Sequence, residues 1–135
     1  YEHYCSDMTR TISVGDLSSE QRRLIEQVME AQSAAIERIE PGVKVSEVDL
    51  EARKVLEKYG LSKYFIHSLG HGVGLAVHEP PTLSPNSKDE LKVGMVFTVE
   101  PGVYIEDIGG VRIEDIVLVT EKGAKLLTSF ERLIV

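Results

Sequence analysis

The sequence predicts an α+β domain in which two helices back an antiparallel sheet. Between residues 18 and 60, apolar residues recur at the three- and four-residue spacing of amphipathic helices. From Tyr64 onward, short apolar stretches alternate with glycines and prolines, as in strands that are joined by turns. With 135 residues, 42% of them hydrophobic, the chain can bury a core, so one domain is expected.

Both helices carry start and stop signals. Ser18 and Gln21 have the form of a capping box at the start of the first helix, and Pro41-Gly42 ends it. Ser46 is expected to cap the second helix and Gly60 to end it. The apolar faces consist of Leu24, Ile25, Val28, Met29, Gln32, Ala35, Ile36 and Ile39 in the first helix, and of Val48, Ala52, Val55, Leu56 and Tyr59 in the second. Both helices are interpreted as structural support for the sheet.

Strands are expected before and after the helices. The alternating pattern of Tyr4–Arg10 predicts a strand that is already in mid-course at Tyr1, which indicates a fragment of a longer polypeptide. Further strands are predicted at Tyr64–Leu69, Met95–Ile105, Val111–Thr120 and, after a hairpin turn at 121–124, Lys125–Thr128. The stretch Pro80–Lys92 contains three prolines and is expected to be a loop.

Composition excludes several classes of function. The net charge is -7, with 15 basic against 22 acidic residues and no basic stripe, so a nucleic-acid partner is not expected and a small or peptidic substrate fits better. No apolar run approaches the roughly 20 residues that span a bilayer, so no membrane partner is expected. Cys5 is the single cysteine, which excludes an internal disulfide and favours a reducing, cytoplasmic location. A packing role is expected for Cys5.

Residues 67–81, HSLGHGVGLAVHEPP, concentrate the first candidate functional groups. The stretch contains His67, His71 and His78. The glycines on both sides of His71 leave space for an imidazole to reach a metal and for a substrate backbone to approach. Alone, the three histidines fit a structural role as well as a metal or catalytic role.

Three carboxylates favour the metal role. Glu100 ends one apolar run and Glu114 lies within another, so both are expected to be partly buried, and Asp7 has the same character. A buried charge needs a cation or a hydrogen-bonded partner. The structural alternative is a buried ion pair with Arg10 or Arg112.

The spacing within the strand favours a common site. Arg112 and Glu114 are two residues apart and point to the same face of a strand. Nitrogen and oxygen ligands without cysteine suit manganese, cobalt or zinc. A carboxylate-rich site of this kind can hold two ions, generate a hydroxide near neutral pH and polarise a carbonyl. The sequence therefore predicts the metal-binding part of a hydrolase.

Four motifs, CSDMTRT, HSLGHGVGLAVHEPP, GMVFTVEPGVYI and GGVRIEDIVLVTEKGAKLLT, follow one another along the chain. Their order closely resembles the catalytic domain of the Xaa-Pro peptidases, prolidase and aminopeptidase P, which share the pita-bread fold with methionine aminopeptidases and creatinase. The resemblance covers essentially the whole chain. It implies metal ligands at Asp7, His71, Glu100 and Glu114, a peptide substrate that contains proline, and a homodimer in the intact enzyme.

The resemblance also implies roles around the metal. Glu100 would be the general base as well as a ligand, and His78 would donate a hydrogen bond to the developing oxyanion. His67 and His78 would both line the substrate site, and His67 would count with them among the catalytic residues. Arg112 would support the ligands or bind a substrate carboxylate.

One ligand of the family pattern falls outside the chain. The family places a further aspartate a few residues upstream of Tyr1, as the main ligand of the second ion. Residues 1–135 are therefore expected to be a C-terminal catalytic domain that is incomplete at its N-terminal side. The intact enzyme would hold two divalent ions, Mn²⁺ or Co²⁺ or else Zn²⁺, and the isolated chain one or none.

Three alternatives remain open. A methionine aminopeptidase-like enzyme is close in chemistry, although TRT after Asp7 and VRIEDIVLVT around Glu114 look more like the Xaa-Pro branch. A non-catalytic peptide-binding module on the same fold is the alternative from another class. Metal-free chemistry of the creatinase kind is least favoured because it has no use for this ligand set.

Overall fold

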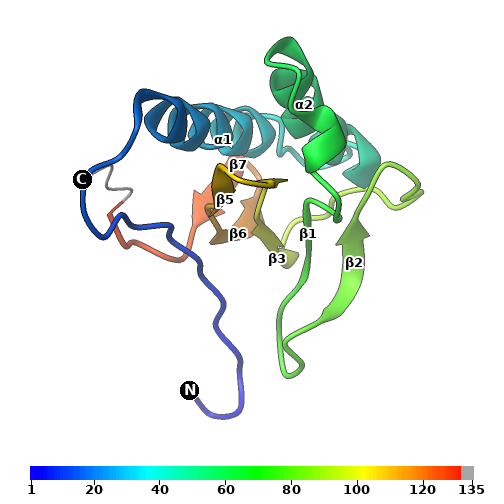
Figure 1. Ribbon diagram of the computed structural model, residues 1–135. Helices are drawn as coiled ribbons and strands as arrows, with labels where there is room; N and C mark the ends of the chain where they lie inside the picture. The colour runs from blue at the N-terminus through cyan, green and yellow to red at the C-terminus, as the bar shows by residue number, and fades with distance from the viewer. Residues whose placement is uncertain (132–135) are drawn as a thin grey trace.

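The computed structural model describes residues 1–131 and has two helices on one side of a mainly antiparallel sheet (Figure 1). The elements in chain order are α1 (Ser19–Glu37), α2 (Val45–Lys58), the 3₁₀ turn η1 (Ser62–Tyr64), β1 (Gly70–Gly72), β2 (Glu79–Leu83), β3 (Val96–Val99), β4 (Gly102–Ile105), β5 (Gly109–Arg112), β6 (Asp115–Thr120) and β7 (Gly123–Leu126). The N-terminal segment and the β1–β2 hairpin extend away from the helices (Figure 1). The α+β class with two supporting helices is confirmed.

Two sheets share the strands. The larger has five strands in the order β2-β1-β3-β6-β7, and all its pairs are antiparallel. The smaller contains β4 and β5. Helix α1 packs on α2 and on strands of both sheets, whereas α2 contacts β2. The core between helices and sheets includes Val28, Leu56, Phe97, Val99 and Val117, each fully buried.

The start of α1 agrees with its prediction, and the start of α2 does not. Ser18 caps α1, and both hydrogen bonds of the capping box with Gln21 are present. Helix α2 begins at Val45 rather than after a cap at Ser46, and Lys44 at its N-cap makes no side-chain cap bond. The Val45 N–H instead donates to Asp89 O at 2.9 Å, so a loop contact replaces the capping side chain.

Two strand predictions and one loop prediction need correction. The segment Tyr4–Arg10 is not a strand of either sheet and pairs through an isolated bridge from Thr9 to Glu114. The Cys5 N–H bonds instead to Gly74 O, and the Tyr4 N–H turns back to Tyr1 O. Residues 64–69 are not a strand, and the Arg53 side chain binds two carbonyls of that segment, those of Phe65 and His67. The predicted loop Pro80–Lys92 begins with strand β2, whose prolines are tolerated because β2 lies at the sheet edge.

The two long predicted strands, Met95–Ile105 and Val111–Thr120, are each divided between the two sheets. The first breaks at Glu100-Pro101, where the Glu100 N–H turns to Leu69 O and proline offers no donor. The second breaks at Ile113-Glu114. The final hairpin is present, but its last strand already begins at Gly123. Both breaks lie at glutamates that the sequence singles out.

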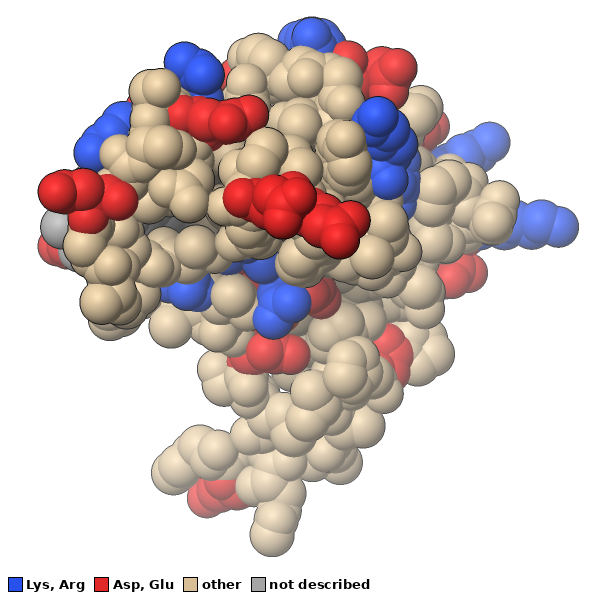
Figure 2. Space-filling model, viewed as in Figure 1, with Lys and Arg blue, Asp and Glu red and all other residues tan. Residues whose placement is uncertain are grey.

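Charge is mixed on the visible surface. On the face in Figure 2, blue basic groups are separated from one another by tan and red atoms, without a continuous basic stripe. Neither helix within residues 1–131 has the length and apolar character that a membrane crossing requires.

Candidate metal centre

His71 lies in β1 and points one ring nitrogen at carboxylates. Its Nδ1 is 3.0 Å from Gly72 O, and because a carbonyl only accepts, Nδ1 carries the hydrogen in the neutral ring. Nε2 then presents a lone pair 3.2 Å from Glu100 Oε1 and 3.7 Å from Asp7 Oδ2. The backbone N–H of His71 donates to Thr98 Oγ1 at 3.0 Å, which anchors this part of β1 to β3.

Glu100 follows the last residue of β3. Thr98, two residues earlier on the same face, donates from Oγ1 to Glu100 Oε1 at 2.9 Å. The Glu100 N–H donates to Leu69 O at 2.8 Å. Side chain and backbone are therefore held separately, and the carboxylate is directed towards His71.

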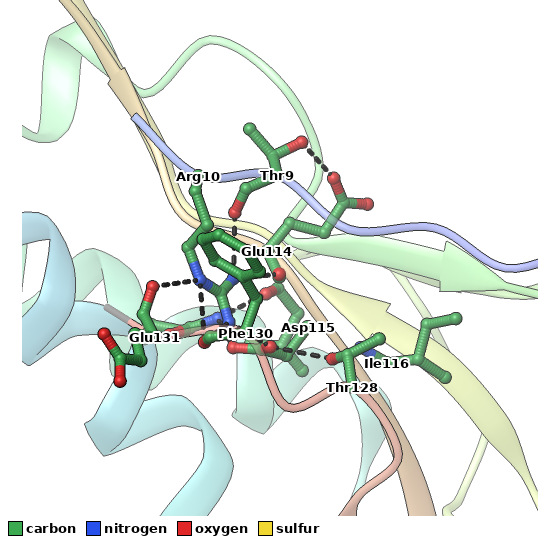
Figure 3. A network of polar contacts seen from close by, with 10 residues as sticks. Thr9, Arg10, Glu114, Asp115, Ile116, Thr128, Phe130 and Glu131 are labelled. Atoms are coloured by element: carbon green, nitrogen blue, oxygen red, sulfur yellow. Dashed lines mark hydrogen bonds and ion pairs between the residues drawn. The ribbon is translucent and has the colours of Figure 1, made fainter. Parts of the chain in front are cut away.

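Glu114 lies just before β6 and is 3% exposed. Its N–H donates to Thr9 O at 2.9 Å, and the Thr9 hydroxyl donates to its Oε2 (Figure 3). Burial raises the pKa of Glu114, and the neighbouring charges of Glu100 and Asp7 raise it further; the Thr9 hydrogen bond and the Arg112 charge oppose this only in part. Like charges are thus crowded in this part of the protein.

Asp7 reaches the site from the N-terminal segment. The Cys5 N–H donates to Gly74 O at 2.8 Å, and the Thr9 bridge to Glu114 holds the segment on the other side of Asp7. Cys5 is half-buried, with its Sγ 3.7 Å from Leu75 O. The segment is therefore fastened on both sides of the aspartate.

Three of the four predicted ligand residues converge, and the fourth contacts one of them. Asp7, His71 and Glu114 offer ligand atoms that all lie within 4.8 Å of one another, and Glu100 contacts the same His71 nitrogen. Ligand atoms at about 2.1 Å from one ion lie about 3 Å apart when they are neighbours in the coordination shell. The spacing and the set of lone pairs and carboxylates fit a divalent cation.

The structural alternative for Glu114, an ion pair with Arg10 or Arg112, is not observed in the part of the chain that the structure describes. Arg10 pairs with Asp115 instead, at 2.6 Å, and Arg112 bonds to the hydroxyls of Thr9 and Tyr104. Within the described chain, no Lys or Arg forms a salt bridge with the Glu114 carboxylate. Burial without such a partner strengthens the case for a cation.

A cavity of about 540 Å³ opens beside His71. Its lining contains the four residues expected near a substrate or a reacting bond, together with His71 and with polar and proline neighbours: His67, Ser68, His71, His78, Glu79, Pro80, Thr82, Glu100 and Arg112. The rings of His71 and His78 are 4.0 Å apart between centroids. His78 is therefore next to the candidate metal centre at the cavity wall.

Both nitrogens of His67 are occupied. Nδ1 is 2.8 Å from Ser68 O and must donate, so Nε2 of the neutral ring accepts from the Tyr104 hydroxyl at 3.0 Å. Arg112 donates from Nη1 to the same hydroxyl at 3.3 Å, a bond that is the main cause of its raised pKa. The guanidinium, the phenol and the imidazole thus form one oriented chain along the cavity.

Several residues of this site are not among those predicted from the sequence. Tyr104 lies four residues after Glu100 and Thr98 two before it, so both could have been found by asking which polar groups share its strands. Thr9 gave the weaker signal of a hydroxyl two residues from Asp7. Such hydroxyls are common in any sheet, and only the fold shows what they contact.

Comparison with known proteins places this geometry in a family. The sequence profile of metallopeptidase family M24 matches residues 1–121, and the chain belongs to that family. The Xaa-Pro dipeptidase of Pyrococcus furiosus is 55% identical over 132 residues, which are 98% of this chain and 38% of that protein. The chain therefore spans about two fifths of the length of this relative.

Solved structures agree in fold. The prolidase from Pyrococcus furiosus superimposes with a TM-score of 0.95, over 98% of this chain and 39% of that one, at 55% identity. The X-Pro aminopeptidase from Thermotoga maritima gives a TM-score of 0.95 at 42% identity, over 98% and 38% of the two chains. The N-terminal domain of the FACT complex subunit SPT16 from Cicer arietinum gives 0.89 at 26% identity, over 97% and 33%. The predicted pita-bread architecture is confirmed by the prolidase matches.

Proposed function

We propose that the protein is a metal-dependent exopeptidase that hydrolyses the bond between an N-terminal residue and proline, as an Xaa-Pro dipeptidase or aminopeptidase. The observation that carries this proposal is the convergence of Asp7, His71 and Glu114, with Glu100 against the same histidine, beside a cavity of about 540 Å³. The 55% identity to an Xaa-Pro dipeptidase supports the choice of substrate.

Asp7, His71, Glu100 and Glu114 would hold the divalent ions. Mn²⁺ and Co²⁺ fit the oxygen-rich set best, and Zn²⁺ is also compatible. A bound ion would supply a nucleophilic hydroxide near neutral pH and would polarise the substrate carbonyl. The protein itself would hold the ligands in place and transfer protons.

Glu100 is the proposed general base. Its Oε1 accepts from Thr98 and faces His71, which leaves Oε2 as the oxygen that accepts a proton from the attacking water. The same carboxyl group then delivers that proton to the proline nitrogen as the bond breaks. The bond before proline is a tertiary amide, so the leaving nitrogen needs this proton.

His78 and Arg112 act on the substrate. His78 would donate a hydrogen bond from its ring to the carbonyl oxygen as negative charge develops there. Arg112 is held by Tyr104 and Thr9 at the cavity wall, where its charge can bind a substrate carboxylate. Because both nitrogens of His67 are engaged, we propose that His67 shapes the pocket and orients Tyr104 rather than transferring a proton.

The wider context of the chain is also proposed. Residues 1–135 would belong to the C-terminal catalytic domain of the protein. The resemblance to Xaa-Pro peptidases supports a homodimer, and a single cysteine fits a cytoplasmic location.

A substrate panel tests the proposal. The protein is loaded in turn with Mn²⁺, Co²⁺ and Zn²⁺, and hydrolysis is followed on an Xaa-Pro dipeptide, an Xaa-Pro tripeptide and Met-Ala. We expect metal-dependent cleavage of the proline peptides only. Cleavage of Met-Ala alone would assign methionine aminopeptidase activity instead.

A peptide-binding module is the second candidate, and one observation favours it. The SPT16 domain is similar in fold and is described as a FACT complex subunit, so this fold occurs outside proteins named as peptidases. The module is distinguished by binding Xaa-Pro peptides without hydrolysing them in the metal-loaded protein. In this protein, the four candidate ligands Asp7, His71, Glu100 and Glu114 favour the enzyme over the module.

A further inference from the structure

Glu100 and Glu114 diverge from a shared point in the sheet. Val99 and Asp115 are opposite each other at one end of the β3–β6 ladder, and the two glutamates are the next residues beyond that pair. Beyond this last pair of the ladder, the two strands separate: the Glu100 N–H donates to Leu69 O, and the Glu114 N–H donates to Thr9 O. The spacing of the two carboxylates therefore depends on what fixes the end of the ladder.

Gln32 of α1 links β3 and β6 at that end of the ladder. It is 0% exposed, and its Nε2 donates to Val99 O at 3.1 Å and to Asp115 Oδ2 at 3.0 Å. Both partners are acceptors, so the amide can be oriented in only one way. One side chain thus joins the residue before Glu100 to the residue after Glu114.

Arg10 extends the connection to the N-terminal segment (Figure 3). It donates from Nη2 to Asp115 Oδ1 at 2.6 Å, and from Nη1 to Glu114 O at 2.6 Å and Thr9 O at 2.9 Å. Thr128 donates to the same Asp115 oxygen at 2.7 Å. Asp115 is therefore the junction of helix α1, strand β6, the C-terminal segment and the segment that carries Asp7.

A purely structural role explains Gln32 poorly. Its Oε1 is buried and has no hydrogen-bond partner among the described residues. A buried amide that is satisfied on one side only is a costly way to fill space on the apolar face of a helix. The directional bonds of Nε2 remain as the reason to have an amide at this position.

We propose that Gln32 is a positioning residue that, through Val99 and Asp115 and together with Arg10, sets the spacing of Glu100 and Glu114 for a divalent ion. This role rests on the proposed metal centre. Residues behind metal ligands typically change affinity by about 10- to 100-fold when they are removed.

Titration of Mn²⁺ into the metal-free protein by calorimetry tests the role. Gln32→Met keeps the side-chain length and removes both donated bonds, so we expect Mn²⁺ affinity to fall at least about tenfold. Gln21→Met is the matched control: it also removes a glutamine bond from α1 to a backbone carbonyl, at Ile108, away from the carboxylates. We expect its affinity to stay within about twofold of wild type, even if its melting temperature falls.

Arg10→Lys is the second variant, and it decides the matter if Gln32→Met does not fold. Lysine keeps the charge beside Asp115 but cannot reproduce the forked bonds to Glu114 O and Thr9 O, so weaker Mn²⁺ binding is expected. Wild-type affinity in a folded Gln32→Met protein, or in Arg10→Lys where the first variant is unfolded, overturns the positioning role. So does an equal loss in Gln21→Met. If the wild-type protein binds no Mn²⁺, the proposed metal centre fails first, and the role fails with it.

Discussion

Glu100 Oε1 and His71 Nε2 are 3.2 Å apart, and both atoms are acceptors when the histidine is neutral. Two facing acceptors repel unless a proton or a metal ion lies between them. Asp7 Oδ2, at 3.7 Å from the same nitrogen, adds to that requirement. The proposed metal centre can therefore be tested by removing one ligand atom, Nε2 of His71.

His71→Ala should therefore abolish tight metal binding. We expect Mn²⁺ affinity to fall by about a hundredfold or more, since loss of a ligand exceeds loss of an outer partner. The control is His3→Ala, because His3 is exposed and remote in sequence from the histidine-rich stretch. Calorimetric titration measures both variants, and equal affinities in His71→Ala and wild type would remove His71 from the site.

Glu100→Gln should separate catalysis from metal binding. Glutamine keeps an oxygen ligand and the acceptor for Thr98 but cannot take a proton, so turnover of an Xaa-Pro dipeptide should fall about a hundredfold or more. Metal content is measured in the same preparation. Wild-type turnover at full metal occupancy would show that another group is the base.

His78→Ala should impair turnover and spare the metal. Loss of one donor to an oxyanion typically costs about 10²- to 10³-fold in kcat. The ring of His78 is adjacent to His71, but no ligand role is proposed for it. Steady-state kinetics with metal analysis would contradict this assignment if metal were lost and turnover recovered on adding excess Mn²⁺.

Much of this site was predictable because its residues lie in motifs that resemble a known family. The helices were predictable for a local reason, since apolar spacing and the Ser18 capping box act within a few turns. The breaks at Glu100-Pro101 and Ile113-Glu114 were not, because apolar runs do not mark where a strand changes its partner. Pairing is decided by distant residues, here Leu69 for Glu100 and Thr9 for Glu114.

Gln32 illustrates the same limit. The sequence places it on the apolar face of the first helix, which is a visible anomaly in that face. Its two acceptors lie 67 and 83 residues away, and nothing in the local pattern indicates them. A polar residue on an apolar stripe therefore predicts a buried hydrogen bond but not its partner.

The raised pKa of Glu114 has a consequence for the metal-free protein. Because the folded state holds this proton more tightly than the unfolded state does, the contribution of Glu114 to stability is lost as the pH rises from the ordinary value of 4.5 through the raised one. Glu114→Gln keeps an acceptor for Thr9 and removes the charge. In EDTA, we expect it to be more stable than wild type at pH 7.

Urea denaturation at pH 7 and pH 4 checks this prediction. The difference between the two proteins should shrink at pH 4, where Glu114 is protonated in the wild type. Both proteins are compared at the same pH, so that contributions from groups remote from Glu114 cancel. A less stable variant at pH 7 would mean that an unrecognised partner compensates the Glu114 charge.

Asp115 should behave in the opposite way from its neighbour. Burial raises the pKa of Asp115, but hydrogen bonds from Arg10 and Thr128 and the Arg10 charge outweigh burial, so the pKa lies below its ordinary value of 3.8. Its contribution to stability is therefore present above pH 3.8 and is lost as the pH falls through the lowered value. Asp115→Ala leaves the Arg10 guanidinium buried without its carboxylate, which should cost about 3–5 kcal/mol at pH 7.

The exposed pair of Lys54 and Glu51 supplies the control for Asp115→Ala. Its ion pair has a similar length, 2.7 Å against 2.6 Å for Arg10 and Asp115, but the Lys54 side chain is 55% exposed. Lys54→Ala should therefore cost at most about 1 kcal/mol. Both free energies of unfolding come from urea denaturation in EDTA, which removes any contribution from bound metal. Equal losses of unfolding free energy in the two variants would mean that the buried Arg10–Asp115 pair contributes no more to stability than the exposed pair.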